Sequence, residues 1–179
     1  MRRWHAIALT ALTALAAAEP AAAGFDRART CENAVGQFGR REVPVGTVAA
    51  IRAVKGYADP AFFATRRDPE TGLYWAKAPV AVRKGKVVSV SIAREDRALA
   101  DLSFYPTREG ETDLRDVVRF SACPRGRGPG ERLWSSWPGG FVLTGPGCVD
   151  LVARARGSRR VHRATLSFGM GEACSRPQE

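Results

Sequence analysis

Residues 80–92 have the sequence VAVRKGKVVSVSI, from which the class of the fold can be predicted. In residues 88–92, valine or isoleucine alternates with serine, a period of two that puts β-branched side chains on one face of a strand. Residues 80–83 alternate in the same way, with valine at every second position. Lys84 and Gly85 separate the two segments and suit a tight turn. The stretch therefore predicts a β-hairpin.

The same period of two recurs on both sides of this hairpin. Turn-forming residues separate the segments at intervals of about eight to twelve residues, which is typical of a sandwich or barrel of antiparallel sheets. We therefore predict an all-β, antiparallel β-sandwich, immunoglobulin-like in general architecture, in a single domain with two disulfides. The further strands expected are residues 98–104, 118–122, 149–154 and 162–168, with weaker ones at 45–54 and 141–144, of which 48–54 also fits a short helix. Loops are expected at residues 56–72, 106–113 and 124–140.

The first 23 residues have the layout of a secretory signal. A basic start at Arg2 and Arg3 precedes an uncharged stretch over residues 6–18, and residues 21–23 are the small alanines that a signal peptidase cuts after. The uncharged stretch is shorter than the roughly 20 residues that span a bilayer. We expect a mature domain over residues 24–179 that is secreted, extracytoplasmic and without a transmembrane anchor. An uncleaved anchor is the alternative.

Four cysteines lie in the expected mature chain, and an even number in an exported protein indicates two disulfides. They are Cys31, Cys123, Cys148 and Cys174. We favour a Cys123–Cys148 bond, which would close the segment between these residues. The companion bond would be Cys31–Cys174, because the ends of compact domains often lie close together. The alternative is Cys31–Cys123 with Cys148–Cys174, which a hairpin between the last two cysteines would bring about.

The chain is strongly basic, with a formal net charge of +10 at pH 7. Such an excess of positive charge attracts anionic partners. All but four of the 28 basic residues are Arg, however, and a chain rich in Arg, Ala and Gly is also typical of a GC-rich genome. The charge therefore indicates either a solvated basic surface or attraction to an acidic cell-envelope polymer or lipid. No nucleic-acid recognition motif accompanies it, so we expect no specific nucleic-acid partner.

The sequence contains no signature of nucleophilic catalysis, of a metal site or of a cofactor. His162 is the one histidine of the expected mature chain, and it shares a strand face with Leu166 and Phe168, where a histidine at the rim of the core is expected. There is no Gly-x-Ser-x-Gly motif for a serine nucleophile. A single histidine without any Cys-x-x-Cys argues against zinc, and oxidised cysteines leave no thiolate for copper. We expect no metal and no cofactor.

Paired carboxylates are the remaining candidates for acid and base chemistry. Glu95 and Asp96 form one pair, and Glu109 and Glu111 form another. Both pairs lie in expected turns beside arginines, so we interpret them as solvated turn charges. The acidic run at residues 109–113 does not have the ligand spacing of a calcium loop.

The segment 124–140 combines arginines with tryptophans, the side chains that most often anchor interfaces. We predict that its side chains form the ligand-binding surface, with the indoles as stacking platforms and the arginines contacting an anionic group. The alternative is that Trp137-Pro138-Gly139-Gly140 caps the end of the sandwich and covers a disulfide. The predicted ligand-binding residues are Arg125, Arg127, Arg132, Trp134 and Trp137. A second aromatic cluster, in and after the loop 56–72, comprises Tyr57, Phe62, Phe63, Tyr74 and Trp75.

Four motifs carry a resemblance to a known family. They are FSACP at residues 120–124, WPGGF at 137–141, CVDL at 148–151 and LSFG at 166–169. With the segment 80–92, they resemble the C-terminal half of a family of uncharacterised secreted β-rich proteins of high-GC bacteria. The resemblance covers about two thirds of the mature chain. It implies export and a β-rich domain, and it brings no activity, ligand or catalytic residue.

Three classes of function are compatible with these observations. We favour a non-catalytic secreted binding module that acts at the cell envelope on an anionic or saccharide partner. The first alternative is a protein-interaction or inhibitor domain directed at an exported protein. The second is a hydrolase that uses surface carboxylates or His162.

Overall fold

The computed structural model of the chain describes residues 29–35, 41–52, 54–104, 114–128 and 133–174. Antiparallel strands dominate these residues, and the α-helix among them, α1 (Pro60–Ala64), has five residues. The strands are β1 (Arg41–Val45), β2 (Ala49–Arg52), β3 (Tyr74–Lys77), β4 (Val80–Arg83), β5 (Val87–Ile92), β6 (Ala100–Phe104), β7 (Val117–Ser121), β8 (Trp134–Trp137), β9 (Gly139–Leu143), β10 (Gly147–Ala155) and β11 (Val161–Phe168). Short 3₁₀ turns are η1 (Cys31–Asn33), η2 (Lys55–Ala58), η3 (Arg94–Asp96) and η4 (Gly171–Cys174). The predicted all-β fold is confirmed, while the expected signal and the expected loop at 106–113 lie outside the described residues.

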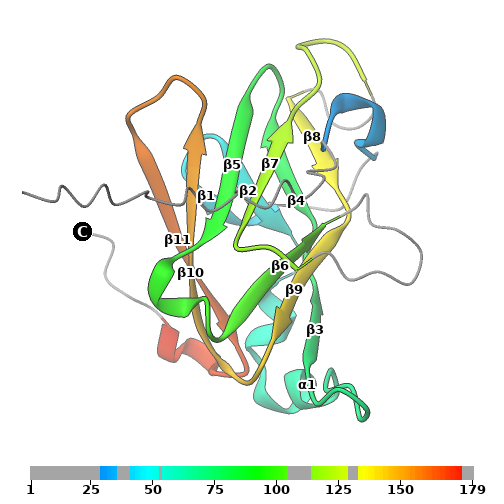
Figure 1. The fold of residues 1–179 in the computed structure, drawn as a ribbon, viewed down its shortest axis with the longest axis vertical. Coiled ribbons are helices and arrows are strands. Elements are labelled where there is room, and N and C mark those ends of the chain that lie inside the picture. Colours follow the sequence, from blue (N-terminus) through cyan, green and yellow to red (C-terminus); the bar gives the residue numbers. More distant parts are fainter. Residues whose placement is uncertain (1–28, 36–40, 53, 105–113, 129–132, 175–179) are drawn as a thin grey trace, which may run out of the picture.

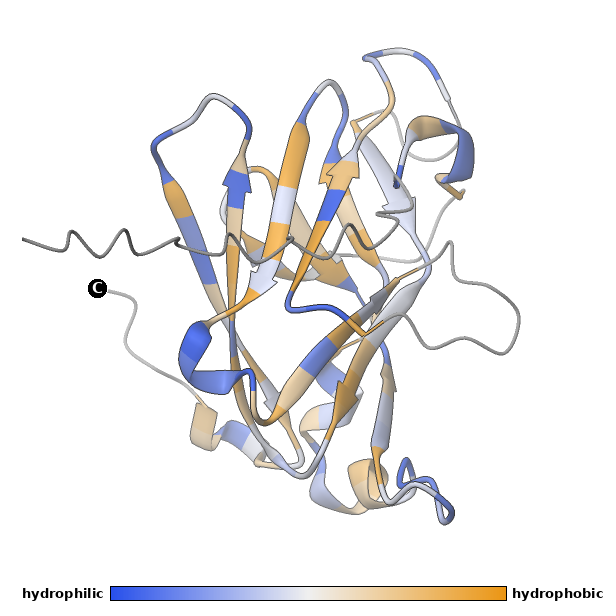
Figure 2. Cartoon of the chain, viewed as in Figure 1, coloured by the Kyte–Doolittle hydropathy of each residue, from blue (hydrophilic) through white to orange (hydrophobic). Residues whose placement is uncertain are grey.

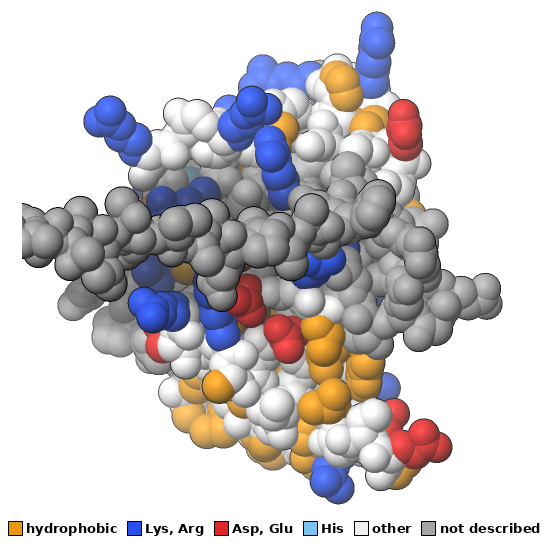
Figure 3. All heavy atoms as spheres, viewed as in Figure 1, with side chains coloured by type: hydrophobic (Ala, Val, Ile, Leu, Met, Phe, Trp, Pro, Cys, Tyr) orange, Lys and Arg blue, Asp and Glu red, His pale blue; other side chains and the backbone are white. Residues whose placement is uncertain are grey.

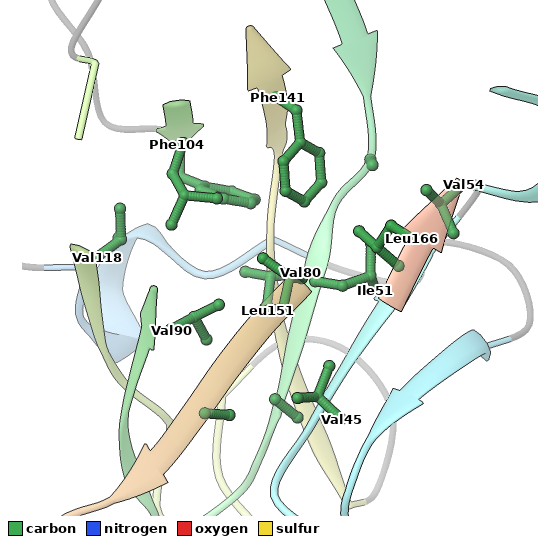
Figure 4. Close-up of a cluster of buried hydrophobic side chains, with 14 of the residues drawn as sticks. Val45, Ile51, Val54, Val80, Val90, Phe104, Val118, Phe141, Leu151 and Leu166 are labelled. Atoms are coloured by element: carbon green, nitrogen blue, oxygen red, sulfur yellow. The ribbon is translucent and has the colours of Figure 1, made fainter. Parts of the chain in front are cut away.

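Three antiparallel sheets enclose one core in a sandwich-like arrangement (Figure 1). One sheet has the strand order β1-β2-β4-β8, the second β11-β10-β5-β7 and the third β3-β9-β6. Figure 2 shows that apolar and polar residues alternate along many of the strands. Side chains from all three sheets meet in the interior, among them Val80, Leu151 and Phe141, which are at most 1% exposed (Figure 4). Burial of this apolar surface is the main force that holds the sheets together.

A bent two-stranded ribbon connects the third sheet to the first. β3 pairs with β9, β4 pairs with β8, and the same register continues from one pair to the other. Between them the Ala78 N–H donates to the carbonyl of Gly139 at 2.9 Å, so the ladder is not interrupted. Pro79 and Pro138 lie at this corner, where strands that change sheets commonly bend. Within the WPGG motif, Trp137 is therefore a core residue at the end of β8, and the residues after it form the corner between the two sheets.

The hairpin predicted over residues 80–92 is wrong. The chain does turn at Lys84 and Gly85, and Gly85 has a φ of 78°, which favours glycine. However, β4 pairs with β2 and β8, whereas β5 pairs with β7 and β10, so the turn joins two sheets. Alternation of apolar residues tells which face of a strand is buried, but not which strand lies beside it. The strands expected at residues 149–154 and 162–168 do pair with each other, as β10 and β11, through a turn at Gly157.

The N-terminal segment, residues 29–35, fills the gap between the first and second sheets. The Ser121 N–H at the end of β7 donates to the Arg29 carbonyl at 2.7 Å, and the Val35 N–H donates to the Ser136 carbonyl of β8 at 2.8 Å. The Arg29 guanidinium is buried and donates to the carbonyl of Phe104 at 2.9 Å. This segment thus links all three sheets.

The two disulfides are Cys31–Cys123 and Cys148–Cys174. The favoured pairing from the sequence, Cys123–Cys148 with Cys31–Cys174, is therefore wrong, and the alternative is correct. The N-terminal segment passes the end of β7 and brings Cys31 to Cys123. Cys148 lies on β10, and η4 returns the chain from β11 to β10, which places Cys174 beside it. Two disulfides indicate an oxidising, extracytoplasmic environment. Within the described residues, no helix has both the length and the apolar character needed to cross a bilayer.

Candidate functional site

The two tryptophans predicted to form a ligand-binding surface are buried. Trp134 is 7% exposed and Trp137 is fully buried. Both belong to β8, which lies inside the segment that the sequence predicts as a loop. β4 flanks this strand on one side and the N-terminal segment flanks it on the other. Neither indole therefore offers a stacking face to solvent, and the role predicted for these two side chains does not fit the structure.

Trp137 instead anchors the N-terminal segment. Its indole N–H donates to the Thr30 carbonyl at 3.2 Å and to Oδ1 of Asn33 at 3.0 Å. Its ring packs on Phe120, with the ring centroids 5.1 Å apart. Since Thr30 and Asn33 flank Cys31, the indole lies beside the turn that carries a disulfide. This agrees with the alternative interpretation of the WPGG motif as a structural cap.

The arginines predicted to bind a ligand are not buried as the two tryptophans are, where the structure describes them. Arg125 and Arg127 are exposed on the turn that follows β7, and Arg132 lies outside the described residues. The turn is held by the Arg127 N–H, which donates to the carbonyl of Pro124 at 3.1 Å. The Arg125 side chain passes beside Gly85, because a Cβ added to that glycine would lie 3.5 Å from Arg125 Cγ.

The turn after β7, which carries Arg125, meets three other turns at one end of the molecule. They are the β1–β2 turn, the β4–β5 turn and the β10–β11 turn. The Arg83 N–H donates to the carbonyl of Val48 at 3.0 Å, and the Gly85 N–H donates to the carbonyl of Cys123 at 2.8 Å. These hydrogen bonds hold basic residues from distant parts of the sequence beside one another.

A pocket of about 330 Å³ lies among these turns. Its lining includes four cationic side chains, the imidazole of His162 and the hydroxyl groups of Thr47 and Ser158. The cations are Arg83, Lys86, Arg125 and Arg160. A second pocket, of about 440 Å³, adjoins the first and shares Ala155 and Ser158 with it. Its cations are Arg119, Arg154 and Arg156.

We call these seven Arg and Lys side chains the basic end of the molecule. All seven are exposed, and Figure 3 shows Lys and Arg gathered at the upper end. Among the described residues, none of the seven forms an ion pair with a carboxylate, and neither pocket is lined by an Asp or Glu. Arginine remains charged at any physiological pH, and its planar fork matches carboxylate and phosphate oxygens. The basic end is therefore a concave surface whose positive charge is not compensated by any carboxylate in the described part of the chain.

His162 also lines this surface, and its partial burial agrees with the expected place at the rim of the core. It is half-buried, and its ring fills the space beside Gly46, whose φ of 59° belongs to the left-handed region. No described residue forms a hydrogen bond or ion pair with the ring, so no described serine is in position to be activated by it. The imidazole can contribute a further polar contact to an anion in the pocket.

The carboxylates predicted as turn charges include one with a structural role. Oδ2 of Asp96 accepts from the Asp150 N–H at 2.7 Å, and Oδ1 of Asp150 accepts from the Thr165 hydroxyl at 2.6 Å. These contacts fasten η3 to the β10–β11 hairpin, while Glu95 is exposed. Glu109 and Glu111 lie outside the described residues. Among the residues that are described, no group of three or more metal-ligating side chains occurs.

Sequence reasoning identifies only Arg125 of the basic end. Five of the other six cations lie near strand ends or beside turns, Arg154 and Arg156 among them at the Gly157 turn, whereas Arg119 lies in the middle of β7. Arginines that flank several predicted turns are a usable signal. They point to one site only when the turns are known to lie at the same end, which depends on the order of strands.

Comparisons of this chain with family models, with curated proteins and with solved structures find no match.

Proposed function

We propose that this protein is a non-catalytic binding module of the cell envelope, and that its basic end holds an acidic polymer. The observation that carries the proposal is the pair of adjoining pockets lined by seven cations and by no described carboxylate. Like charges held this close repel one another, and an anionic ligand relieves the repulsion. Two adjoining pockets favour a partner with repeated anionic groups over a single small anion.

Export to the envelope is part of this proposal. The two disulfides support it, as does the signal-like layout of the first 23 residues. The resemblance to secreted proteins of high-GC bacteria points the same way. Mass spectrometry of the exported protein should find an N-terminus near Gly24, and a chain that still begins at Met1 would contradict cleavage.

A binding experiment with a phosphate polymer tests the site. The mature domain is titrated with long-chain inorganic polyphosphate, and neutral dextran serves as the uncharged comparison. We expect saturable binding of polyphosphate only, weakened as salt rises, because salt screens exposed charges over about 8–10 Å. Retention of an acidic exported protein in place of polymers would favour the interaction-domain alternative.

Two variants with equal loss of charge separate the site from the net charge. The first combines Arg83→Gln, Lys86→Gln and Arg125→Gln. The matched control combines Arg67→Gln, Arg94→Gln and Arg163→Gln, three exposed arginines outside the basic end. We expect the first variant to bind at least about tenfold more weakly, a change of roughly 1.4 kcal/mol, with the control close to the native protein. Equal weakening in both would mean that net charge alone attracts the polymer.

A further inference from the structure

A third pocket, of about 600 Å³, lies toward the other end of the molecule, near β3 and α1 (Figure 1). Its volume is within the range of about 300–1,000 Å³ typical of small-molecule sites. It extends from the segment after α1 across β3 and β9 to Ser103 of β6. None of the seven cations of the basic end lines it. We call it the Trp75 pocket.

Trp75 supplies an exposed aromatic wall. The alternation of β3 buries Ala76 and turns Trp75 and Lys77 outward. Trp75 is 40% exposed, whereas the indoles of Trp134 and Trp137 are buried. Its backbone N–H donates to the carbonyl of Arg66 at 3.2 Å, which fixes the strand from which the indole projects. The sequence predicts an exposed aromatic platform in the segment 124–140. The structure instead has an exposed indole in the second aromatic cluster, at Trp75.

Two cations stand beside the indole. Arg66 is exposed, and its guanidinium carbon lies 4.4 Å above the centre of the Phe62 ring, a cation–π contact that limits its freedom. Lys77 follows Trp75 by two residues on the same face of β3. Neither forms an ion pair with a described carboxylate. An acidic group bound in this pocket could form ion pairs with both Arg66 and Lys77.

Hydroxyl groups complete the polar lining, and that of Thr65 already donates to the Phe62 carbonyl at 2.7 Å. Tyr57 is 8% exposed, and its hydroxyl oxygen accepts from the Lys77 N–H at 2.8 Å. The hydroxyl proton of Tyr57 forms no hydrogen bond with a described residue and is free to donate. The Ser103 hydroxyl likewise bonds to no described residue. A ligand with several hydroxyl groups can use both.

Glycines form the surface between these side chains. Lys77, Gly140 and Ser103 lie side by side on three adjacent strands, so no side chain rises between the lysine and the serine. A Cβ on Gly140 would collide with the carbonyl oxygen of Ala76, and one on Gly139 would collide with Phe104. The close approach of the strands therefore requires glycine here, and it leaves the pocket open at its centre.

We propose that the Trp75 pocket binds an acidic sugar residue, a pyranose ring that carries a carboxylate. The C–H groups of the ring pack on the indole face of Trp75, because the negative face of an aromatic ring attracts weakly positive hydrogens. The carboxylate pairs with Arg66 and Lys77, and the ring hydroxyls bond to Tyr57 and Ser103. This is a second site, and it goes beyond the polymer binding assigned to the basic end.

Other occupants fit the lining less well. A hydrocarbon ligand would bury both cations and both hydroxyls without partners, which is costly. A peptide that extends the sheet needs free backbone groups at the edge of β3. There the N–H groups of Trp75 and Lys77 already donate to Arg66 and Tyr57. An acidic sugar uses the aromatic face, the charges and the hydroxyls together.

Tryptophan fluorescence of the mature domain tests the proposal directly. The probes are digalacturonate and its neutral counterpart galactobiose. Since Trp75 is the exposed indole among the three of the mature chain, we expect digalacturonate to change the emission saturably and galactobiose to bind at least about tenfold more weakly. Equal binding of the two sugars, or no binding of either, would overturn the proposal.

Variants measured by calorimetry identify the pocket. We expect Trp75→Ala to weaken digalacturonate binding at least about tenfold, Trp75→Phe to weaken it less, and Arg66→Gln with Lys77→Gln to abolish the preference for the acidic sugar. Ser103→Ala is the substitution to use if Trp75→Ala fails to fold, and it should weaken binding of both sugars. Unchanged affinity in these variants would overturn the assignment.

The basic-end variant separates the two sites. Arg83→Gln with Lys86→Gln and Arg125→Gln should bind digalacturonate as the native protein does, and Trp75→Ala should bind polyphosphate as the native protein does. Loss of digalacturonate binding in the basic-end variant would place the sugar at the basic end and overturn the second site. Failure of polyphosphate binding alone would contradict only the function proposed for the basic end.

Discussion

The indole N–H of Trp137 and Oδ1 of Asn33, 104 residues apart in the chain, are joined by a hydrogen bond of 3.0 Å. The same Oδ1 also accepts from the Thr30 N–H at 2.9 Å. The amide of Asn33 thereby ties the N-terminal segment both to itself and to β8. The contact holds the segment in the position from which it links the three sheets.

Replacement of Trp137 should therefore reduce stability and leave binding intact. Trp137→Phe keeps an aromatic ring but loses the N–H donor, and we expect a loss of about 1–3 kcal/mol. Trp137→Ala also leaves a cavity and should cost about 3–5 kcal/mol. Urea unfolding measures the stability of both variants. Trp75→Phe, an exposed control, should stay within about 0.5 kcal/mol of the native protein. A Trp137→Phe protein as stable as the native one would contradict the anchoring role.

The two disulfides should contribute unequally. Cys31–Cys123 spans 92 residues and Cys148–Cys174 spans 26. Because a longer loop loses more chain entropy when it is closed, removing the first bond should cost about 4–5 kcal/mol and removing the second about 3–4 kcal/mol. Paired Cys→Ser variants, compared by thermal or urea unfolding, measure the difference. Peptide mapping without reductant should recover Cys31 with Cys123, and a peptide that joins Cys31 to Cys174 would contradict this fold.

Gly140 should not tolerate a side chain. In Gly140→Ala the new Cβ meets the carbonyl oxygen of Ala76, which belongs to the backbone of the paired strand and cannot move away. We expect a loss of about 1–3 kcal/mol, as for other overpacked sites. Gly145→Ala is the matched control, since nothing lies within 4 Å of its added Cβ. Equal melting temperatures of the two variants would show that β3 and β9 can move apart to accommodate the methyl group.

Asp101 should make stability depend on pH. Burial, and secondarily the charge of Asp116, raises the pKa of the Asp101 carboxyl above its ordinary 3.8. The folded state therefore binds this proton more tightly than the unfolded chain, so the stabilisation that this group contributes is fully present below pH 3.8 and is lost as pH rises through the raised pKa. Asp101→Asn should raise the melting temperature at pH 7 and have little effect at pH 3. The gain should stay below about 1 kcal/mol, because water screens a carboxylate that is only partly buried.

Asp116→Asn is the comparison for that measurement. It removes the like charge near Asp101, but it also breaks the ion pair with Arg97, whose nitrogen lies 3.0 Å from the Asp116 oxygen. The two effects oppose each other, so the gain at pH 7 should be smaller than for Asp101→Asn. A destabilised Asp101→Asn protein at pH 7 would mean that the ionised carboxylate makes a favourable contact.

The class of the fold and the buried faces of its strands follow from local properties of the sequence. Alternation in residues 88–92 and 162–168 predicts which side chains enter the core, because the period of a strand is a local property of the chain. The β10–β11 hairpin was predictable for the same reason, since its turn at Gly157 joins two strands that pair directly. The rim position of His162 follows from its place in that pattern.

Which strands are neighbours depends on long-range packing, and every contact between distant residues depends on that order. The turn at Lys84 and Gly85 joins two sheets, Cys31 pairs with Cys123, and Trp137 is enclosed by a segment that starts more than a hundred residues earlier. The basic end and the Trp75 pocket depend on the same order of strands. Each collects side chains from several turns or strands, and periodicity along one strand carries no information about which other strand lies beside it.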